Sequence, residues 1–250
     1  MQMKTYKHII FTRFDTFSAA RFDDNWLKYR LEIFKKYTLQ SILHQDVDNL
    51  ALWIRYNIHF KAEVQELNNY LKTLQLPCFF TYYKDGVDYE TDELFDYVKD
   101  SDLVIETRID SDDMYHKTAM SEIQSFDIDE NQIYTFQDGY LYRESTNQLY
   151  NYKGSCAPFY TCVYPTSAFI DRALKQEYYP FLPDASKFPA LKLLSDNKYI
   201  VVVHDKNDSS YTVDWVKSNN LQSGSFAKVS GDDIIKKNKQ EILNEFKKWN

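Results

Sequence analysis

Short apolar runs alternate with stretches of helical spacing through the first half of the chain. The runs are rich in β-branched and apolar residues, which predicts buried strands, and the stretches between them repeat apolar residues every three or four positions, which predicts amphipathic helices. Strands that alternate with helices pair in parallel through right-handed crossovers. The predicted strands are residues 7–14, 50–58, 78–83 and 103–109, and the predicted helices are residues 24–37, 38–45, 63–74 and 91–99.

The pattern changes after residue 113. Short aromatic strands are predicted within residues 132–152, where Asp138-Gly139 and Thr146-Asn147 are turn pairs of antiparallel hairpins. We therefore expect one α/β domain that has a mainly parallel sheet, helices on both faces and an antiparallel addition. The remaining predicted elements are helices 116–125, 167–176 and 232–249, strands 159–164 and 199–204, and an irregular loop over 178–189.

The composition fits a globular domain with its own core. Of the 250 residues 44% are apolar, which suffices for one large domain. The net charge of -7 is spread along the chain and argues against a nucleic-acid surface, while a local basic groove stays open. The 3 cysteines form no CxxC pair, which indicates buried thiols in a reducing compartment.

Hydropathy predicts a protein that is soluble or only peripherally attached to a membrane, and the cysteines favour the cytoplasm. The first residues lack the apolar core of a signal peptide, and no apolar run approaches the roughly 20 residues that span a bilayer. In helix 232–249, however, lysines flank an apolar stripe, a pattern that can lie on an anionic membrane surface. This interpretation predicts peripheral attachment at the inner face of the membrane. In the other interpretation the apolar stripe packs on the domain itself.

Three carboxylates follow the predicted strand 103–109, where the chain reads LVIETRIDSDD. Open α/β sheets bind their ligands at the carboxyl ends of strands. On extended backbone Asp110 and Asp112 point the same way, and neighbouring like charges need a cation or a shared proton. The cluster therefore predicts a divalent metal, Mn²⁺ or Mg²⁺, whereas an acidic turn that caps the next helix is the structural alternative.

Several chemistries remain open for this cluster. A calcium EF-hand loop fails because Met114 and Tyr115 replace a ligand and a glycine. A metal-dependent phosphatase or phosphotransferase would use Asp110 as nucleophile, with residues 231–233 as a later acidic motif. A glycosyltransferase would use the DxD to hold a metal against a donor diphosphate. A carbohydrate-binding protein would carry the acids without catalysis. The absence of GxGxxG and GxxxxGK[ST] argues against dinucleotide oxidoreductases and P-loop kinases.

The chain resembles the bacterial rhamnosyltransferase family, which has the glycosyltransferase-A type of fold. The similar segments are TRF (12–14), residues 26–45, LALWIRY (50–56), TRIDSDD (107–113) and IVVVHDKN (200–207). The resemblance implies one domain over residues 1–250, with a nucleotide-sugar-binding half at 1–113 and an acceptor half at 114–250. It further implies transfer of a sugar, by the family name a deoxyhexose such as rhamnose, to a surface glycan or lipid-linked glycan.

The resemblance also implies roles for individual acids. Asp112 is expected to be the main metal ligand, Asp110 to contact the metal or the donor ribose, and Asp113 to orient the donor sugar. A late histidine completes the metal site in many enzymes of this fold, which assigns His204 as a ligand, and imidazole suits Mn²⁺. The other interpretation of His204 is a solvated residue after a strand.

Donor binding is assigned to Thr12, Arg13 and Phe14 at the end of the first strand and to Arg108 before the acids. Guanidinium groups are the natural forks for a diphosphate, although these arginines can instead form salt bridges with the acid cluster. No catalytic base is identified. Asp138 is expected to be a hairpin-turn residue, and Asp171 and Asp205 remain candidates.

Overall fold

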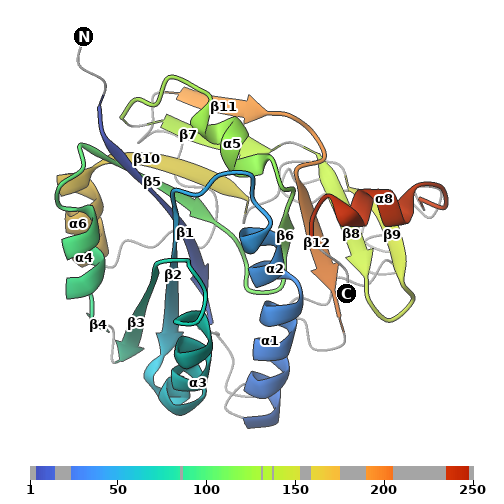
Figure 1. Ribbon diagram of the computed structural model, residues 1–250, viewed down its shortest axis with the longest axis horizontal. Coiled ribbons are helices and arrows are strands. Elements are labelled where there is room, and N and C mark those ends of the chain that lie inside the picture. Colours follow the sequence, from blue (N-terminus) through green and yellow to red (C-terminus); the bar gives the residue numbers. More distant parts are fainter. Residues whose placement is uncertain are drawn as a thin grey trace, which may run out of the picture.

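The fold contains two β-sheets that lie beside each other (Figure 1). This computed structural model describes residues 4–14, 24–84, 87–130, 132–136, 138–152, 159–174, 190–204 and 235–247. The larger sheet has the order β11 (Ala190–Leu194), β7 (Gln132–Phe136), β10 (Tyr160–Pro165), β5 (Leu103–Arg108), β1 (Tyr6–Arg13), β2 (Leu50–Asn57), β3 (Cys78–Lys84) and β4 (Val87–Tyr89). The smaller sheet has the order β6 (Met114–Tyr115), β12 (Tyr199–Val203), β8 (Gly139–Arg143) and β9 (Gln148–Tyr152).

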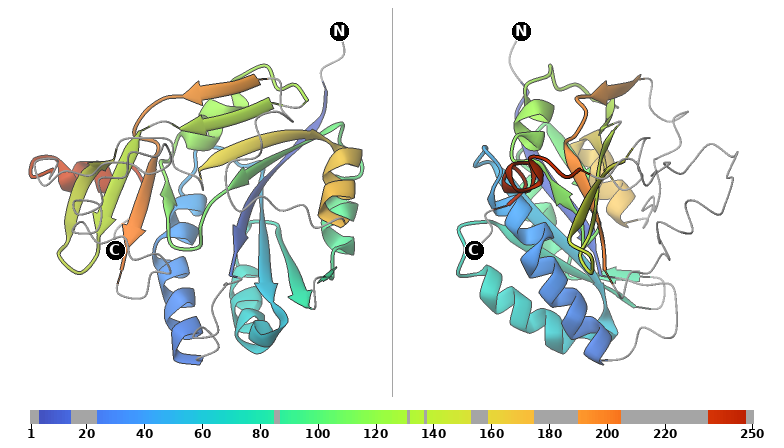
Figure 2. Two further views of the ribbon diagram at one scale, coloured as in Figure 1. Left: turned by 180° about the vertical axis from the view of Figure 1, so that it is seen from behind. Right: turned by 90° about the vertical axis from the view of Figure 1, so that its right-hand side faces the viewer.

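Helices cover both faces of the larger sheet (Figure 2). Alternate residues of β1 enter different cores: Ile10 belongs to one, and Ile9 and Phe11 belong to the other. Strands that are covered on both faces read as continuous apolar runs, which is why this part of the sequence predicts strands clearly. The first core contains residues of α1 (Asp24–Lys36), α2 (Thr38–Leu43), α3 (Lys61–Leu71) and α5 (Ala119–Gln124), and the second contains residues of α4 (Asp92–Val98) and α6 (Thr166–Leu174).

The predicted α/β fold is confirmed. Strands β5, β1, β2 and β3 pair in parallel in that order, and β10 joins β5 in the antiparallel sense. Strands β7, β10 and β11 come from the later part of the chain, so the larger sheet draws on both halves of the sequence. The division at residue 113 therefore does not coincide with a division between sheets.

One predicted hairpin is confirmed and the other is wrong. Strands β8 and β9 are antiparallel around residues 144–147, where Asn147 has a φ of 50°. The Asp138-Gly139 pair, by contrast, joins β7 to β8, which belong to different sheets. A Cβ on Gly139 would lie 2.6 Å from the ring of Tyr199, so glycine here permits close approach of that ring and does not form a hairpin turn.

The last helix is shorter than the predicted helix 232–249. It is α8 (Lys239–Asn244), and Asn238 directly before it has a φ of 60°, which interrupts helical backbone. Leu243 and Phe246 are buried in a core beside the smaller sheet, so the packing interpretation is confirmed for these two side chains. Membrane contact through this segment stays a prediction. No helix in the described ranges has the length and apolar content to cross a bilayer.

The predicted loop 178–189 and the acidic motif 231–233 lie outside the described residues.

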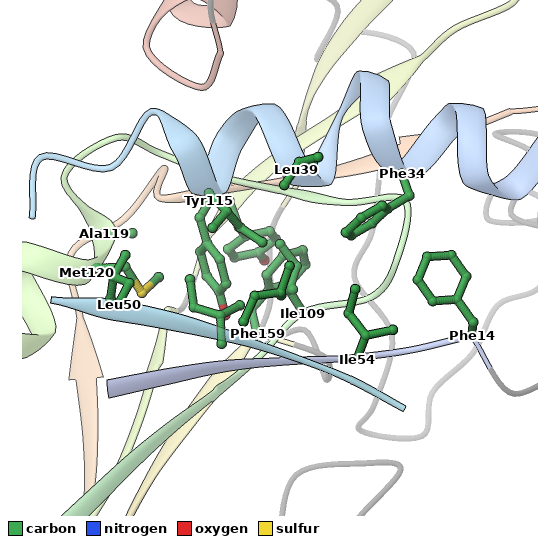
Figure 3. Close-up of a cluster of buried hydrophobic side chains, with 14 of the residues drawn as sticks. Phe14, Phe34, Leu39, Leu50, Ile54, Ile109, Tyr115, Ala119, Met120 and Phe159 are labelled. Carbon is green, nitrogen blue, oxygen red and sulfur yellow. The ribbon is translucent and has the colours of Figure 1, made fainter. Parts of the chain in front are cut away.

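A compact aromatic and aliphatic core fixes α1 and α2 over the sheet. Figure 3 shows Phe34 of α1 above Ile54 and beside Phe14 at the end of β1, and the two phenyl rings meet edge to face at 5.1 Å. This packing sets the distance between α1 and the carboxyl ends of the strands.

Candidate active site

Parallel pairing brings the carboxyl ends of β5, β1 and β2 to one edge of the larger sheet. The backbone N–H of Ile109 donates to the carbonyl of Phe11 at 3.0 Å, so the acid loop leaves the sheet beside Thr12 and Arg13. Tyr115 donates from its hydroxyl to the carbonyl of Arg108 at 2.7 Å and fixes the start of the loop. The location predicted for the acidic cluster is therefore the one observed.

Three arginines share one face of the sheet at this edge. Arg108 of β5 is in register with Phe11, Arg13 follows two residues later on β1, and Arg13 is in register with Arg55 of β2. Register partners on parallel strands and residues two apart on one strand point to the same face. Sequence reasoning named Arg13 and Arg108 but missed Arg55, because only the register aligns it with them.

Each described carboxylate of the acid loop has a partner from the chain itself. Asp110 accepts a hydrogen bond from Nη2 of Arg108 at 2.8 Å, and its side chain is 46% exposed. Asp113 is buried and accepts from the backbone N–H of Val202 at 2.9 Å, which joins the loop to β12. Burial, followed by the charges of Asp112 and Asp110, raises the pKa of Asp113 well above its ordinary value.

Asp112 lies at the centre of a buried polar cluster that also contains Arg30, Ser111 and His204. Nη1 of Arg30 lies 2.6 Å from Oδ2 of Asp112 and 3.1 Å from Nε2 of His204, and Nη2 donates to the hydroxyl of Ser111 at 2.7 Å. Nε2 of His204 lies 3.2 Å from the same carboxylate oxygen. Burial favours the neutral acid, but the charge of Arg30 and hydrogen bonding within the cluster outweigh it and lower the pKa of Asp112 to about 2.

Sequence reasoning missed Arg30 as a site residue. It lies on the apolar face of α1, between the buried positions Leu27 and Phe34, and is itself only 6% exposed. An arginine on a helix face that otherwise enters a core needs a buried partner, and that was the available signal. Nothing in the sequence indicates that the partner is Asp112.

The three predicted donor residues at the end of β1 differ in burial and in their contacts. Thr12 is fully buried, and its hydroxyl oxygen has no hydrogen-bond partner among the described residues. Arg13 is half-buried; burial raises the pKa of Asp110, and the charges of Arg108 and then Arg13 oppose that rise. Phe14 is 2% exposed and packs on Phe34, so its ring is a core group, and the predicted donor contact of this side chain has no support in its packing.

The candidate catalytic bases stay unassigned. The backbone carbonyl of Asp138 accepts from Asn197 at 2.7 Å at the passage between the two sheets. Asp171 lies on the exposed side of α6, and Asp205 lies outside the described residues. A cavity of about 430 Å³ lies elsewhere, between α3 and the edge of β3, and is lined by residues including Leu71, Cys78 and Glu93.

The predicted metal ligands do not form a metal site as they are placed here. Asp110 is turned toward Arg108, and within the described ranges no three His, Cys, Asp or Glu side chains gather so as to hold a metal ion. A cation bound by Asp112 and His204 would lie roughly 2.0–2.3 Å from each ligand atom. The guanidinium of Arg30 already occupies the position next to both atoms, so this arrangement does not fit a divalent metal.

No protein-family model matches the sequence, and no curated protein matches it. Several solved structures have a related arrangement of elements. Residues 1–349 of S. aureus TarS, in complex with UDP-GlcNAc, share 14% identity over 84% of this chain at a TM-score of 0.47. This chain spans 64% of the length of that one.

Two further solved structures are similar at the same level. The glycosyltransferase GlyE of Streptococcus pneumoniae TIGR4 shares 13% identity over 69% of this chain and 37% of its own, at a TM-score of 0.38. HddC from Yersinia pseudotuberculosis shares 12% identity over 78% of this chain and 93% of its own, at a TM-score of 0.41. At these values a functional conclusion has to come from the site itself.

Proposed function

We propose that the protein is a glycosyltransferase that takes its sugar from a nucleotide-sugar donor. The observation that carries the proposal is the row of Arg108, Arg13 and Arg55 on one face of the sheet edge, beside the half-exposed carboxylate of Asp110. Arg55 is held in a buried ion pair with Asp88 at 2.8 Å, so Arg13 and Arg108 are the members of the row assigned to the diphosphate. Guanidinium groups bind diphosphate oxygens as bidentate forks, and carboxylates accept hydrogen bonds from sugar hydroxyls. A nucleoside diphosphate sugar presents both kinds of group next to each other.

The position of the row supports the same proposal. Ligands of open α/β sheets bind outside the carboxyl ends of the strands, and three adjacent parallel strands end here. Within this proposal Asp110 faces the donor ribose or sugar. Asp113 holds the acid loop to β12 and so positions the loop beside the donor. Transfer of a deoxyhexose such as rhamnose to a surface glycan or lipid-linked glycan is the finer form of the proposal, and the family resemblance alone suggests it.

Calorimetric titration with UDP, GDP, CDP and dTDP tests the donor site. We expect one nucleotide to bind and Arg13→Met to weaken its binding at least tenfold, because a charged fork to the diphosphate is lost. Asp110→Asn should weaken it less, since a carboxamide still accepts one hydrogen bond. Arg143→Met is the matched control, since it removes the same kind of side chain from β8 in the smaller sheet.

The nucleotide that binds identifies which sugar nucleotides to assay as donors. The corresponding sugar nucleotides should be hydrolysed slowly by the parent protein, and Arg13→Met should slow that release of the nucleoside diphosphate. If none of the four nucleotides binds under any condition, the proposal is wrong.

The phosphatase alternative uses the same loop, since Asp110 is exposed enough to reach a substrate. It predicts release of phosphate from small phosphomonoesters that Asp110→Asn abolishes. Binding of free sugars without nucleotide would instead support a carbohydrate-binding protein.

A further inference from the structure

Each of the three loop acids has a partner within the chain, and two of these partners are cations. Asp110 pairs with Arg108 at 2.8 Å, Asp112 pairs with Arg30 at 2.6 Å, and Asp113 is held by a backbone N–H. Clustered carboxylates require a cation or a proton, and this requirement was the reason to expect a metal. Here arginine side chains from β5 and α1 supply the cation for Asp110 and for Asp112.

The atoms around Arg30 are arranged as ligands around a cation. Nε2 of His204 lies 3.1 Å from Nη1 of Arg30 and 3.2 Å from Oδ2 of Asp112, so this nitrogen accepts from Arg30 in one tautomer and donates to Asp112 in the other. In both tautomers the carboxylate oxygen of Asp112 and Nε2 of His204 converge on the same nitrogen of Arg30. These are the two atoms that would otherwise bind a divalent metal.

Arg30 is held firmly in this position. Its second terminal nitrogen donates to Ser111 at 2.7 Å, and its guanidinium carbon lies 5.7 Å from the ring centre of Trp26, one helical turn earlier. The ring of Tyr29, the residue before it, packs against the imidazole of His204 at 5.4 Å. Withdrawal of Arg30 would therefore break contacts to the acid loop and to its own helix together.

We propose that Arg30 takes the place of a divalent metal at Asp112 and His204, so that binding of a nucleoside diphosphate at this edge does not depend on a metal. This inference rests on the proposed function. Arg30 acts as a positioning residue, since it neutralises Asp112 and fixes the loop, while Arg13 and Arg108 on the adjacent strands face the diphosphate. The metal assignment of Asp112 and His204 is replaced by an ion pair of the chain with itself.

Titration of the protein with Mn²⁺, followed by the electron paramagnetic resonance signal of the free ion, tests the assignment without any nucleotide. The parent should leave the signal of free Mn²⁺ unchanged. Arg30→Met should bind Mn²⁺ at least tenfold more tightly than the parent, because Asp112 and His204 lose their cation, and adding Asp112→Asn should abolish that gain. Uptake of Mn²⁺ by the parent that Asp112→Asn removes would overturn the proposal.

Two controls separate charge from folding. Arg30→Lys keeps a cation in place and should gain no Mn²⁺ binding, while Lys28→Met removes an exposed cation from the same helix and should behave as the parent. If Arg30→Met does not fold, the parent alone still decides the question. Its affinity for the nucleotide that binds should differ by less than about threefold between EDTA and MnCl₂, and a tenfold gain with Mn²⁺ would overturn the proposal.

The outcomes also distinguish this inference from the function on which it rests. Metal-dependent nucleotide binding would leave the glycosyltransferase proposal intact and end the role of Arg30. Absence of nucleotide binding would end the glycosyltransferase proposal, and the Mn²⁺ titration would still decide what Arg30 does at Asp112.

Discussion

Loss of the buried cation of Arg172 should destabilise the fold strongly. Arg172 of α6 forms an ion pair with Glu106 of β5, and the two side chains are 7% and 2% exposed. Arg172→Met keeps much of the side chain's volume but leaves the carboxyl of Glu106 buried without its main partner. Breaking a buried pair in this way costs about 3–5 kcal/mol. At roughly 2–4 °C per kcal/mol for a chain of this size, Tm should fall by about 6–20 °C.

The loss should depend on pH in a defined direction. Burial raises the pKa of Glu106 above its ordinary value, and the charges of Arg172 and Arg108 oppose that rise. Without Arg172 the folded-state pKa rises further above the unfolded value. A raised carboxyl pKa gives stability that is present at low pH and is lost as pH rises through the folded pKa. The deficit of Arg172→Met relative to the parent should therefore be larger at about pH 7.5 than at about pH 5.

Thermal and denaturant unfolding of the parent and Arg172→Met at both pH values measures the effect. The double variant Glu106→Gln with Arg172→Met should recover part of the loss, because no charge remains buried. Lys99→Met is the control, since it removes the cation of an exposed pair with Asp96 and should leave the unfolding transition unchanged. A deficit below about 1 kcal/mol for Arg172→Met, or one equal at both pH values, would refute this reasoning.

Two other predictions concern buried positions in the two sheets. Burial lowers the pKa of His8 to about 3, so the stability that its neutral form contributes is complete above about pH 6.5 and is lost as pH falls toward 3. The unfolding free energy of His8→Asn should accordingly change less than the parent's between about pH 7 and 4, and equal slopes would contradict this. Gly139→Ala places a methyl group against the ring of Tyr199 and should lower stability by about 1–3 kcal/mol in thermal unfolding, whereas an unchanged Tm would show that the ring can move aside.

Local pattern was sufficient to predict the strands of the parallel core and the position of the acids, but not the last helix or the strand partners of the later segments. The apolar runs that became β1, β2 and β5 are buried on both faces, and the acid loop follows β5 as expected. These features depend on residues within about ten positions of each other, where spacing alone determines which face is buried. The turn pair at Thr146-Asn147 is of the same local kind, and its hairpin was predicted correctly.

Tertiary structure decided what the site is made of. Arg30 and His204 lie 82 and 92 residues from Asp112 in the sequence, and they meet it because α1 packs over the sheet and β12 joins the smaller sheet. Likewise, β7 and β8 on either side of the Asp138-Gly139 pair belong to different sheets, because the packing of the whole core determines which strands pair. The sequence by itself determined that the clustered acids need a positive charge. Only the fold decided that an arginine on α1 lies where that charge is required, because helix rotation and sheet register set which distant side chains come into contact.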